Sequence, residues 1–555
     1  MYKYSRIIAA GILLFLSVII SAQGFSQSSN NFEISKNLDI FATLFKELNK
    51  NYVDEISPGE LVESGIEAML KELDPYTVFI PESEVEDYKF ITTGQYGGVG
   101  ALIQKQGESI VVAEPYEGNP AQKNGVKAGD IILEVDGQEV TGKSTEDVST
   151  ILKGQPGTFV KVLFQREGIV EPFEKVMERE YVKIENIPFY GVIGDGIGYI
   201  RLSGFTQEAG KEVKNAFLEL KANNELKGFV LDLRGNGGGL LQEAVSITNI
   251  FVDKGNTVVS TKGKLPNKNY TYLTTSPAVD KEIPLIVLVD NSSASASEIV
   301  AGAIQDLDRG VILGQRTYGK GLVQNVIPLS YNAQVKITVA KYYIPSGRCI
   351  QAIDYTNRDE NGDASVTPDS LHTAFKTLNG RTVYDGIGIE PDIITEQENL
   401  SPLSTSLLMK YLFFNYATKF EREHPSIASA KEFEITDEIY NDFVVYLTDK
   451  DYDYTTKCEE TLNQLKEFAH DEKYEDAIQP ELELLAKKLK DNKDSDIAKH
   501  KVEIKKILKL EIIARYYYQK GQIIASLSED PDIAKAINLL NEKSSYMAIL
   551  EGTRP

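Results

Sequence analysis

The chain has 555 residues, too many for one hydrophobic core, and this length predicts roughly three or four domains. Its composition is that of a globular protein, with 42% hydrophobic and 25% charged residues. A net charge of -23 argues against binding a phosphate backbone, which requires a basic face, so no nucleic-acid partner is predicted.

Residues 1–24 are predicted to be a signal peptide. Lys3 and Arg6 form a charged start, and residues 7–20 form an apolar run that is short for a membrane span. Ala22-Gln23-Gly24 fits a small-x-small cleavage site. The mature protein is therefore expected to be periplasmic or secreted. The alternative is that the segment stays uncleaved and anchors the protein, and this would be its only attachment to a membrane.

Residues 25–90 are predicted to be a helical region. One helix carries an apolar stripe, and a second is expected over residues 61–73. The stripe residues are Leu38, Phe41, Leu44, Phe45 and Leu48. This pattern is typical of packing and indicates no chemistry.

Residues 91–178 change to short strands and turns. A strand is expected from Ala101, a short helix after Asn119, a strand and tight turn over residues 129–137, and a helix after Ser144. In this order the features resemble a PDZ domain, a short-stranded β module with two helices. A PDZ domain adds an extended peptide tail to a sheet edge and holds its terminal carboxylate with backbone N–H groups. The turn Gly97-Gly98-Val99-Gly100 would hold that carboxylate.

Residues 179–400 return to an α/β pattern. The nearly apolar run 228–234 predicts a buried strand, and it leads into the glycine-rich loop 235–239. Glycines let a backbone approach a ligand or direct N–H groups outward, and the helix expected over residues 241–251 adds a positive terminus. A plain turn is the alternative for this loop.

One βαβ unit, Asp290 to Gln324, brings serines and a lysine within reach of each other. An apolar strand precedes the hydroxyl-rich turn 291–297, a helix follows, and Lys320 lies in a glycine-flanked loop. Ser295 also fits a capping box with Glu298, so capping is the alternative role for it. The loop 314–321 resembles a phosphate-binding loop, but Gly321 stands where a hydroxyl would hold magnesium, which argues against nucleotide binding.

The histidines argue against a Ser-His-Asp triad, because all four follow this unit: His372, His424, His470 and His500. No pair of them is spaced for zinc, and no metal or cofactor is predicted. A desolvated, neutral lysine amine can instead act as general base for a serine. If residues 320–324 are extended, Lys320 and Gln324 share one face, and Gln324 could orient the amine.

The unit resembles the active-site region of the carboxy-terminal processing peptidases, also called tail-specific proteases. That family has a Ser-Ala-Ser-Ala-Ser-Glu turn, a lysine 25 residues later in a Gly-Lys-Gly loop, and a glutamine four residues beyond. The resemblance implies that Ser295 is the nucleophile, with Lys320 and Gln324 as its catalytic partners. It places the oxyanion site at the N–H groups of Gly238 or Gly239 and of Ala296.

The resemblance runs from about residue 35 to 395 and implies an α/β, crotonase-like (ClpP-like) protease core with an inserted PDZ domain. Residues 401–555 are predicted to be a helical extension whose role is open, and a homo-oligomer and pairing of Cys349 with Cys458 are also open. The implied function is that of a serine endopeptidase that cleaves exported proteins and recognises apolar C-terminal tails. The alternatives are an inactive PDZ adaptor on a protease scaffold and a crotonase-like acyl-CoA enzyme.

Overall fold

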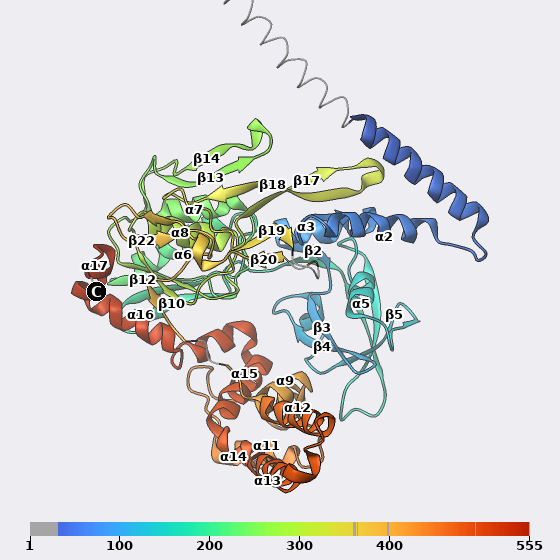
Figure 1. Ribbon diagram of the computed structural model, residues 1–555. Helices are drawn as coiled ribbons and strands as arrows, with labels where there is room; N and C mark the ends of the chain where they lie inside the picture. Colours follow the sequence, from blue (N-terminus) through green and yellow to red (C-terminus); the bar gives the residue numbers. More distant parts are fainter. Residues whose placement is uncertain (1–30, 359–361, 363, 397–398, 494, 554–555) are drawn as a thin grey trace, which may run out of the picture. The chain divides into compact units, whose positions relative to one another are not determined.

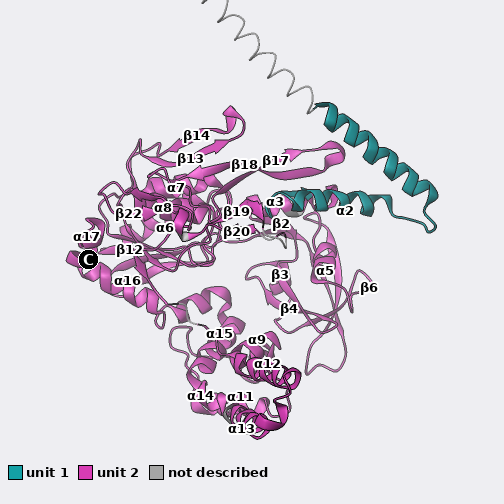
Figure 2. Cartoon of the chain, viewed as in Figure 1, with its two compact units in different colours: residues 1–79 teal, residues 80–555 magenta. Residues whose placement is uncertain are grey.

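The computed structural model describes residues 31–358, 362, 364–396, 399–493 and 495–553. The chain divides into two compact units, residues 1–79 and 80–555 (Figure 2). The predicted signal peptide, residues 1–24, lies outside the described residues. Among the residues that are described, no helix is both long enough and apolar enough to cross a membrane.

The first unit contains the two expected helices, one over residues 31–51 and α2 (Pro58–Lys71) (Figure 1). Strand β1 (Val78–Ile80) includes the last two residues of this unit and the first residue of the second. The ring of Phe41 lies 3.8 Å from the place that a Cβ would take at Gly65 of α2, so the helices touch there. Most of the predicted packing stripe is open to solvent, because Leu38 is 64% and Leu44 56% exposed, and Phe45 is half-buried.

The second unit begins with a short helical segment and then forms the PDZ domain. The antiparallel sheet has the order β3-β4-β5-β7-β8, with β6 paired to β5. Helix α5 begins after Ser144, whose hydroxyl accepts the Asp147 N–H at 3.1 Å, as predicted. The elements are η1 (Glu82–Glu84), α3 (Val85–Thr93), β2 (Gln95–Gly98), β3 (Ala101–Gln106), β4 (Ser109–Pro115), α4 (Pro120–Lys123), β5 (Ile131–Val135), β6 (Gln138–Glu139), α5 (Thr145–Leu152), β7 (Phe159–Gln165), β8 (Phe173–Glu178) and β9 (Glu180–Lys183).

The α/β core is built on a six-stranded sheet of order β10-β11-β12-β15-β16-β23. The first pair is antiparallel and the remaining pairs are parallel. The elements are β10 (Phe189–Ile193), β11 (Ile197–Arg201), α6 (Ala209–Asn223), β12 (Gly228–Asp232), α7 (Leu241–Phe251), β15 (Leu285–Val289), α8 (Ala296–Asp306), β16 (Val311–Gly314) and β23 (Ile393–Ile394). Residues 386–392 form a loop that precedes β23.

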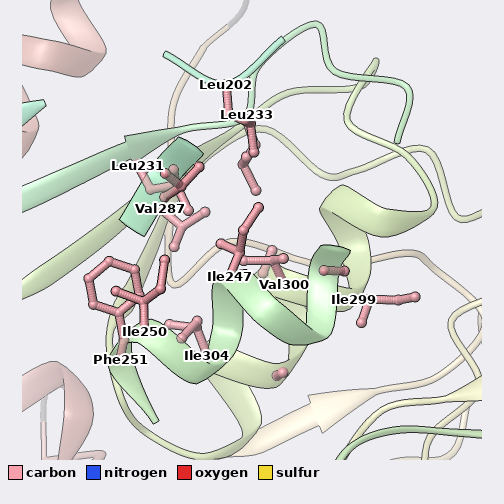
Figure 3. Close-up of a cluster of buried hydrophobic side chains, with 14 of the residues drawn as sticks. Leu202, Leu231, Leu233, Ile247, Ile250, Phe251, Val287, Ile299, Val300 and Ile304 are labelled. Atoms are coloured by element: carbon pink, nitrogen blue, oxygen red, sulfur yellow. The ribbon is translucent and has the colours of Figure 1, made fainter. Parts of the chain in front are cut away.

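Alternate residues of the central strands point to opposite faces of this sheet. On one face, side chains such as Leu231 and Val287 pack against α6, α7 and α8, for example against Ile247 and Val300 (Figure 3). On the other face, their neighbours such as Val230 and Ile286 pack against helices from the end of the chain. Burial on both faces explains why these strands are nearly continuous apolar runs.

A second sheet borders the core, with β14, β13, β18 and β17 side by side. Two short hairpins follow it. The bounds are β13 (Thr257–Gly263), η2 (Pro266–Lys268), β14 (Tyr270–Leu273), β17 (Leu322–Pro328), η3 (Ser330–Asn332), β18 (Gln334–Tyr343), β19 (Ile353–Arg358), β20 (Ala364–Val366), η4 (Asp369–Leu371), β21 (Ala374–Lys376) and β22 (Thr382–Tyr384).

The remaining residues are helical, as predicted, but they divide between two places. Helices α9, α10, α11 and α15 surround a core of their own that includes Phe413, Phe443 and Ile512, and α12 packs against α13. Helices α16 and α17 cover the second face of the α/β sheet. The bounds are α9 (Pro402–Met409), α10 (Leu412–Glu423), α11 (Asp437–Tyr446), α12 (Lys457–Asp471), α13 (Glu475–Lys493), α14 (Asp496–Lys499), α15 (Lys501–Ser526), α16 (Pro531–Asn541) and α17 (Lys543–Leu550).

Candidate active site

Ser295 lies in the turn between the carboxyl end of β15 and the start of α8. Its backbone has φ 57° and ψ −113°, a combination that is rare for a residue with a side chain. Such a conformation costs of order 1–3 kcal/mol and persists only where the surroundings impose it, commonly at functional sites. The turn therefore resembles the strained strand-to-helix turns that present catalytic nucleophiles.

The neighbouring serines have structural partners. The Ser293 hydroxyl donates to the Leu233 carbonyl and the Ser297 hydroxyl to the Asn236 carbonyl, each at 2.8 Å, and both side chains are fully buried. Ser295 is only partly buried. Of the three alternating serines, Ser295 is thus the one that a substrate can reach.

The Glu298 carboxylate joins the serine turn to the lysine loop. Its Oε2 accepts the backbone N–H of Ser295 at 2.9 Å and that of Lys320 at 3.0 Å. Its Oε1 accepts the Gly319 N–H at 2.6 Å and the Thr317 hydroxyl at 2.7 Å. Because one oxygen bonds both amides, the backbones of Ser295 and Lys320 lie next to each other.

Burial raises the pKa of Glu298, and hydrogen bonds from Thr317, Lys320 and Ser295 oppose that rise. The Tyr342 hydroxyl lies 3.3 Å from Glu298 Oε2, and burial together with this carboxylate raises the pKa of Tyr342 well above its ordinary value. Glu298 therefore acts as more than the capping partner expected from the sequence, since it also orders the loop that carries Lys320.

Asn236 and Asp290 hold the glycine loop against the serine turn. The Asn236 carbonyl accepts the Ala294 N–H at 3.1 Å, and Asp290 accepts the Gly235 N–H at 2.9 Å. A Cβ at Gly238 would lie 2.7 Å from the Ser295 Cβ, so only glycine permits this approach. The loop was predicted to approach a ligand, and in the structure it approaches the serine turn.

The three predicted oxyanion residues differ in their hydrogen bonds. The Gly238 N–H donates to the Asn236 side-chain oxygen at 2.9 Å. Within the part of the chain that the structure describes, the N–H groups of Gly239 and Ala296 have no acceptor. Of the alternatives Gly238 and Gly239, this geometry favours Gly239 as the second donor.

Residues 320–324 do not form one extended run, so the condition under which Lys320 and Gln324 would share a strand face is not met. Strand β17 begins at Leu322, and Gly321 has φ +63°, so the two-residue alternation does not extend back to Lys320. Gln324 lies in β17, and its side-chain amide donates to the Thr338 hydroxyl at 3.2 Å. A role for Gln324 in orienting the lysine amine therefore does not follow from a shared strand face.

The predicted carboxylate turn of the PDZ domain is shorter than expected. Gly97 and Gly98 belong to β2, which pairs with Tyr181 and Glu180 of β9. Only Val99 and Gly100 form the connection to β3, and Gly100 has φ +70°. The sequence treated all four residues as one turn, because pairing with a strand some eighty residues away leaves no local signal.

Cys349 and Cys458 are both free thiols. In the described ranges, no cluster of histidine, cysteine and carboxylate side chains is arranged to hold a metal ion.

Three residues of the site were not predicted from the sequence: Thr317, Tyr342 and Asn236. Only Asn236 had a local signal, its place between glycines.

Three family models match the chain. Peptidase family S41 matches residues 196–362, a PDZ domain residues 111–166, and the C-terminal helical domain of probable PDZ-proteases residues 403–540. The last match covers helices that the sequence resemblance had left out.

Among similar proteins, the carboxy-terminal-processing protease of Bartonella bacilliformis is 37% identical over 62% of this chain and 80% of its own length. The carboxy-terminal processing protease CtpA of Bacillus subtilis is 29% identical over 62% of this chain and 73% of its own. The solved photosystem II D1 C-terminal processing protease aligns with 65% of this chain and 93% of its own, at 29% identity and a TM-score of 0.35. With its S41 peptidase region, its PDZ domain and its C-terminal helical domain, the chain belongs to the carboxy-terminal-processing proteases of peptidase family S41.

Proposed function

We propose that the protein is a serine endopeptidase with Ser295 as nucleophile and Lys320 as general base. The main support is the Glu298 carboxylate, one oxygen of which accepts hydrogen bonds from the backbone N–H groups of both residues. The strained φ of Ser295 and the buried hydroxyls of Ser293 and Ser297 support the same assignment. No observation favours an inactive adaptor or an acyl-CoA enzyme.

In the proposed reaction, the neutral Lys320 amine takes the proton of the Ser295 hydroxyl, and the oxygen attacks the scissile carbonyl. The N–H groups of Gly239 and Ala296 stabilise the resulting oxyanion, and such donors are worth roughly 3 kcal/mol each. The lysine ammonium then gives its proton to the leaving amine. Lys320 next deprotonates a water molecule, which hydrolyses the acyl-enzyme and regenerates Ser295.

Substitution at the two residues tests this proposal. Ser295→Ala should abolish peptide cleavage and change stability by only about 1 kcal/mol, since a capping residue is lost. Lys320→Arg should also be inactive, because a guanidinium is not deprotonated in a protein. Ser293→Ala and Ser297→Ala are the matched comparisons, because each loses a structural hydrogen bond to the chain around the glycine loop and should keep measurable cleavage, which Ser295→Ala should not. An active Ser295→Ala or Lys320→Arg enzyme would contradict the assignment.

We also propose that the core is of the crotonase-like (ClpP-like) type and that the protein is exported to the periplasm or secreted. The parallel sheet flanked by α6, α7 and α8 supports the first statement. The charged start and apolar run of residues 1–24 support the second. The mass of the protein purified from its host tests export, because cleavage after Gly24 gives a defined loss, and an uncleaved anchor gives none.

We further propose that the PDZ domain selects substrates by apolar tails with a free C-terminal carboxylate. Val99 and Gly100, between β2 and the edge strand β3, are the candidate binding turn. Amidation of the C-terminus removes the negative charge and keeps the side chains. An amidated peptide should be cut about 10-fold more slowly, if one charge-assisted bond of about 1.5 kcal/mol is lost. Equal rates for the free-acid and amidated peptide at sub-saturating concentration would contradict this selection.

The helix over residues 31–51 supports a homo-oligomer. Its apolar residues follow the alternating spacing of four and three that pairs helices with one another. They are Ile34, Leu38, Phe41, Phe45 and Leu48. Leu38 and Phe41 are each at least 50% exposed. We expect light scattering to give a multiple of the monomer mass for the wild type and the monomer mass for Leu38→Glu, and equal masses would contradict the pairing.

A further inference from the structure

Arg234 stands between strand β12 and the glycine loop of the active site. The carboxylate of Asp232, the last residue of β12, is fully buried and accepts from Arg234 Nε at 3.0 Å and Nη2 at 2.7 Å. Arg201 Nη1 donates to the same carboxylate at 2.8 Å. Burial opposes ionisation of Asp232, but the two guanidinium groups outweigh it and hold the pKa of Asp232 well below its usual value.

A helix from the far end of the chain reaches the same guanidinium. Arg234 Nη2 lies 2.8 Å from Asp530 Oδ2, and Arg234 Nη1 lies 3.2 Å from Asp532 Oδ2. Asp530 also caps α16, since its Oδ1 accepts the backbone N–H groups of Asp532 at 2.9 Å and Ile533 at 3.1 Å. The start of α16 is thus fixed to Arg234 by two carboxylates.

From Arg234 the chain runs directly into the donors of the proposed oxyanion site. Gly235 follows it and donates to Asp290, and Asn236 then bonds Leu202, Gly238 and the serine turn. A shift of Arg234 therefore displaces a loop whose N–H groups must be placed within a few tenths of an ångström of an oxyanion.

We propose that Asp530 and Asp532 are positioning residues of the active site, which hold Arg234 and thereby the loop that carries the Gly239 N–H. This inference rests on the proposed oxyanion role of that N–H. It assigns a catalytic purpose to the end of the C-terminal helical region, which the sequence left without a role.

If the ion pairs of α16 with Arg234 served only to attach this helix to the sheet, they would not need to lie beside the glycine loop or to consist of charged groups. The same region is already joined to the sheet at its opposite end, where the Tyr546 hydroxyl bonds the backbone N–H and carbonyl of Leu285 at 2.9 and 3.1 Å. Buried ion pairs contribute little net stability compared with apolar packing, and their best-supported role is to fix one geometry. The ion pairs of α16 lie where geometry matters for catalysis, at the carboxyl end of β12.

The test is the double variant Asp530→Asn with Asp532→Asn in the full-length enzyme. Asparagine caps helices as well as aspartate, so α16 keeps its start while Arg234 loses its two charged partners on α16 and retains Asp232. We expect kcat to fall about 10- to 100-fold with KM unchanged, because a displaced donor weakens only the transition state. A peptide boronate, whose serine adduct carries an oxyanion, should bind more weakly by a similar factor.

Tyr546→Phe is the matched control, since it breaks the same helical region's contact at the other end of the sheet. It should lower the melting temperature at least as much as the double variant and leave kcat and boronate affinity unchanged. Equal kcat losses in the two proteins, or a raised KM with normal kcat in the double variant, would overturn the inference. Cleavage by Ser295→Ala would instead refute the proposed function, so the two failures are distinguishable.

Discussion

The two faces of the α/β sheet are covered by helices of very different origin. On one face, α6, α7 and α8 come from the chain that connects the strands themselves, and α8 starts at Ser295. On the other face, α16 and α17 return more than two hundred residues after β16. Both faces are buried, since Ile247 on the first and Ile533 on the second are at most 1% exposed.

This difference separates two tasks that one core must perform. The helices of the first face are tied to their strands by short connections, and those connections carry the serine turn, the lysine loop and the glycine loop. The helices of the second face carry none of the groups proposed to react. They complete the sheet and, through Asp530, reach the base of the glycine loop.

The largest effect should follow removal of α16 and α17, the helices that cover the second face of the sheet and are called the second cover below. A chain that ends at Glu529 lacks seven residues that bury the second face: Ile533, Ala536, Leu539, Leu540, Tyr546, Ile549 and Leu550. Each large side chain contributes about 1.5–3 kcal/mol, so the loss is on the order of 10 kcal/mol and approaches the whole stability of a domain. We expect the cooperative unfolding transition of the α/β core to disappear from the near-ultraviolet circular dichroism, whereas the PDZ domain and the helices α9, α10, α11 and α15 keep cores of their own. A chain that ends at Gly552 keeps both helices and serves as control, and a normal transition in the shorter chain would show that the second cover is dispensable.

A smaller effect compares single residues of the two covers. Ile247→Ala and Ile533→Ala each remove a fully packed side chain and should each cost about 2–5 kcal/mol in urea unfolding. The two losses should add in the double variant, because the residues lie on opposite faces and share no packing cluster. Leu218→Ala, at a residue that is 43% exposed on α6, should change stability by less than about 0.5 kcal/mol. A negligible loss for Ile533→Ala alone would mean that the distant cover packs less firmly than the local one.

The sequence predicted the first face of the sheet and the helices that cover it well, and local patterns explain why. The helix expected over residues 241–251 is α7 (Leu241–Phe251), and the buried strand expected over residues 228–234 is β12 (Gly228–Asp232). Their boundaries follow from apolar periodicity and from glycines within a few residues. The choice of Ser295 among the neighbouring serines came from the resemblance to the carboxy-terminal processing peptidases, and the buried hydroxyls of Ser293 and Ser297 are consistent with it.

The second cover and the precise contacts of the site were not predicted, because they depend on residues that are distant in sequence. The sequence around Ile533 carries no local signal that this residue packs against a strand some three hundred residues earlier. The pairing of Gly97 with Tyr181 and the break at Gly321 before β17 are likewise decided by tertiary contacts. Glu298 was predicted only as a capping residue, since its bond to the Lys320 backbone spans 22 residues.

The smallest effect concerns pH and belongs to the first face alone. Burial raises the folded-state pKa of Glu298 above its ordinary value of 4.5, so the folded protein holds this proton more tightly than the unfolded chain. The stabilising contribution of this group is therefore fully present below about pH 4.5 and is lost as the pH rises through the folded-state pKa. Each unit of the shift corresponds to about 1.4 kcal/mol. Glu298→Gln cannot titrate, so the stability of the wild type relative to this variant, measured by urea unfolding, should decline as the pH rises above about 4.5.

Activity should change in the opposite direction, because the ionised carboxylate alone can accept from the backbones of Ser295 and Lys320 together with Gly319 and Thr317. Glutamine offers one acceptor oxygen to these donors, and Glu298→Gln should cleave peptides more slowly at every pH. On the second face, Ile533→Ala contains the same titrating Glu298 as the wild type and should shift the stability curve without changing its slope. If the curves of Glu298→Gln and the wild type are parallel, Glu298 does not titrate in this range, and its hydrogen bonds outweigh its burial.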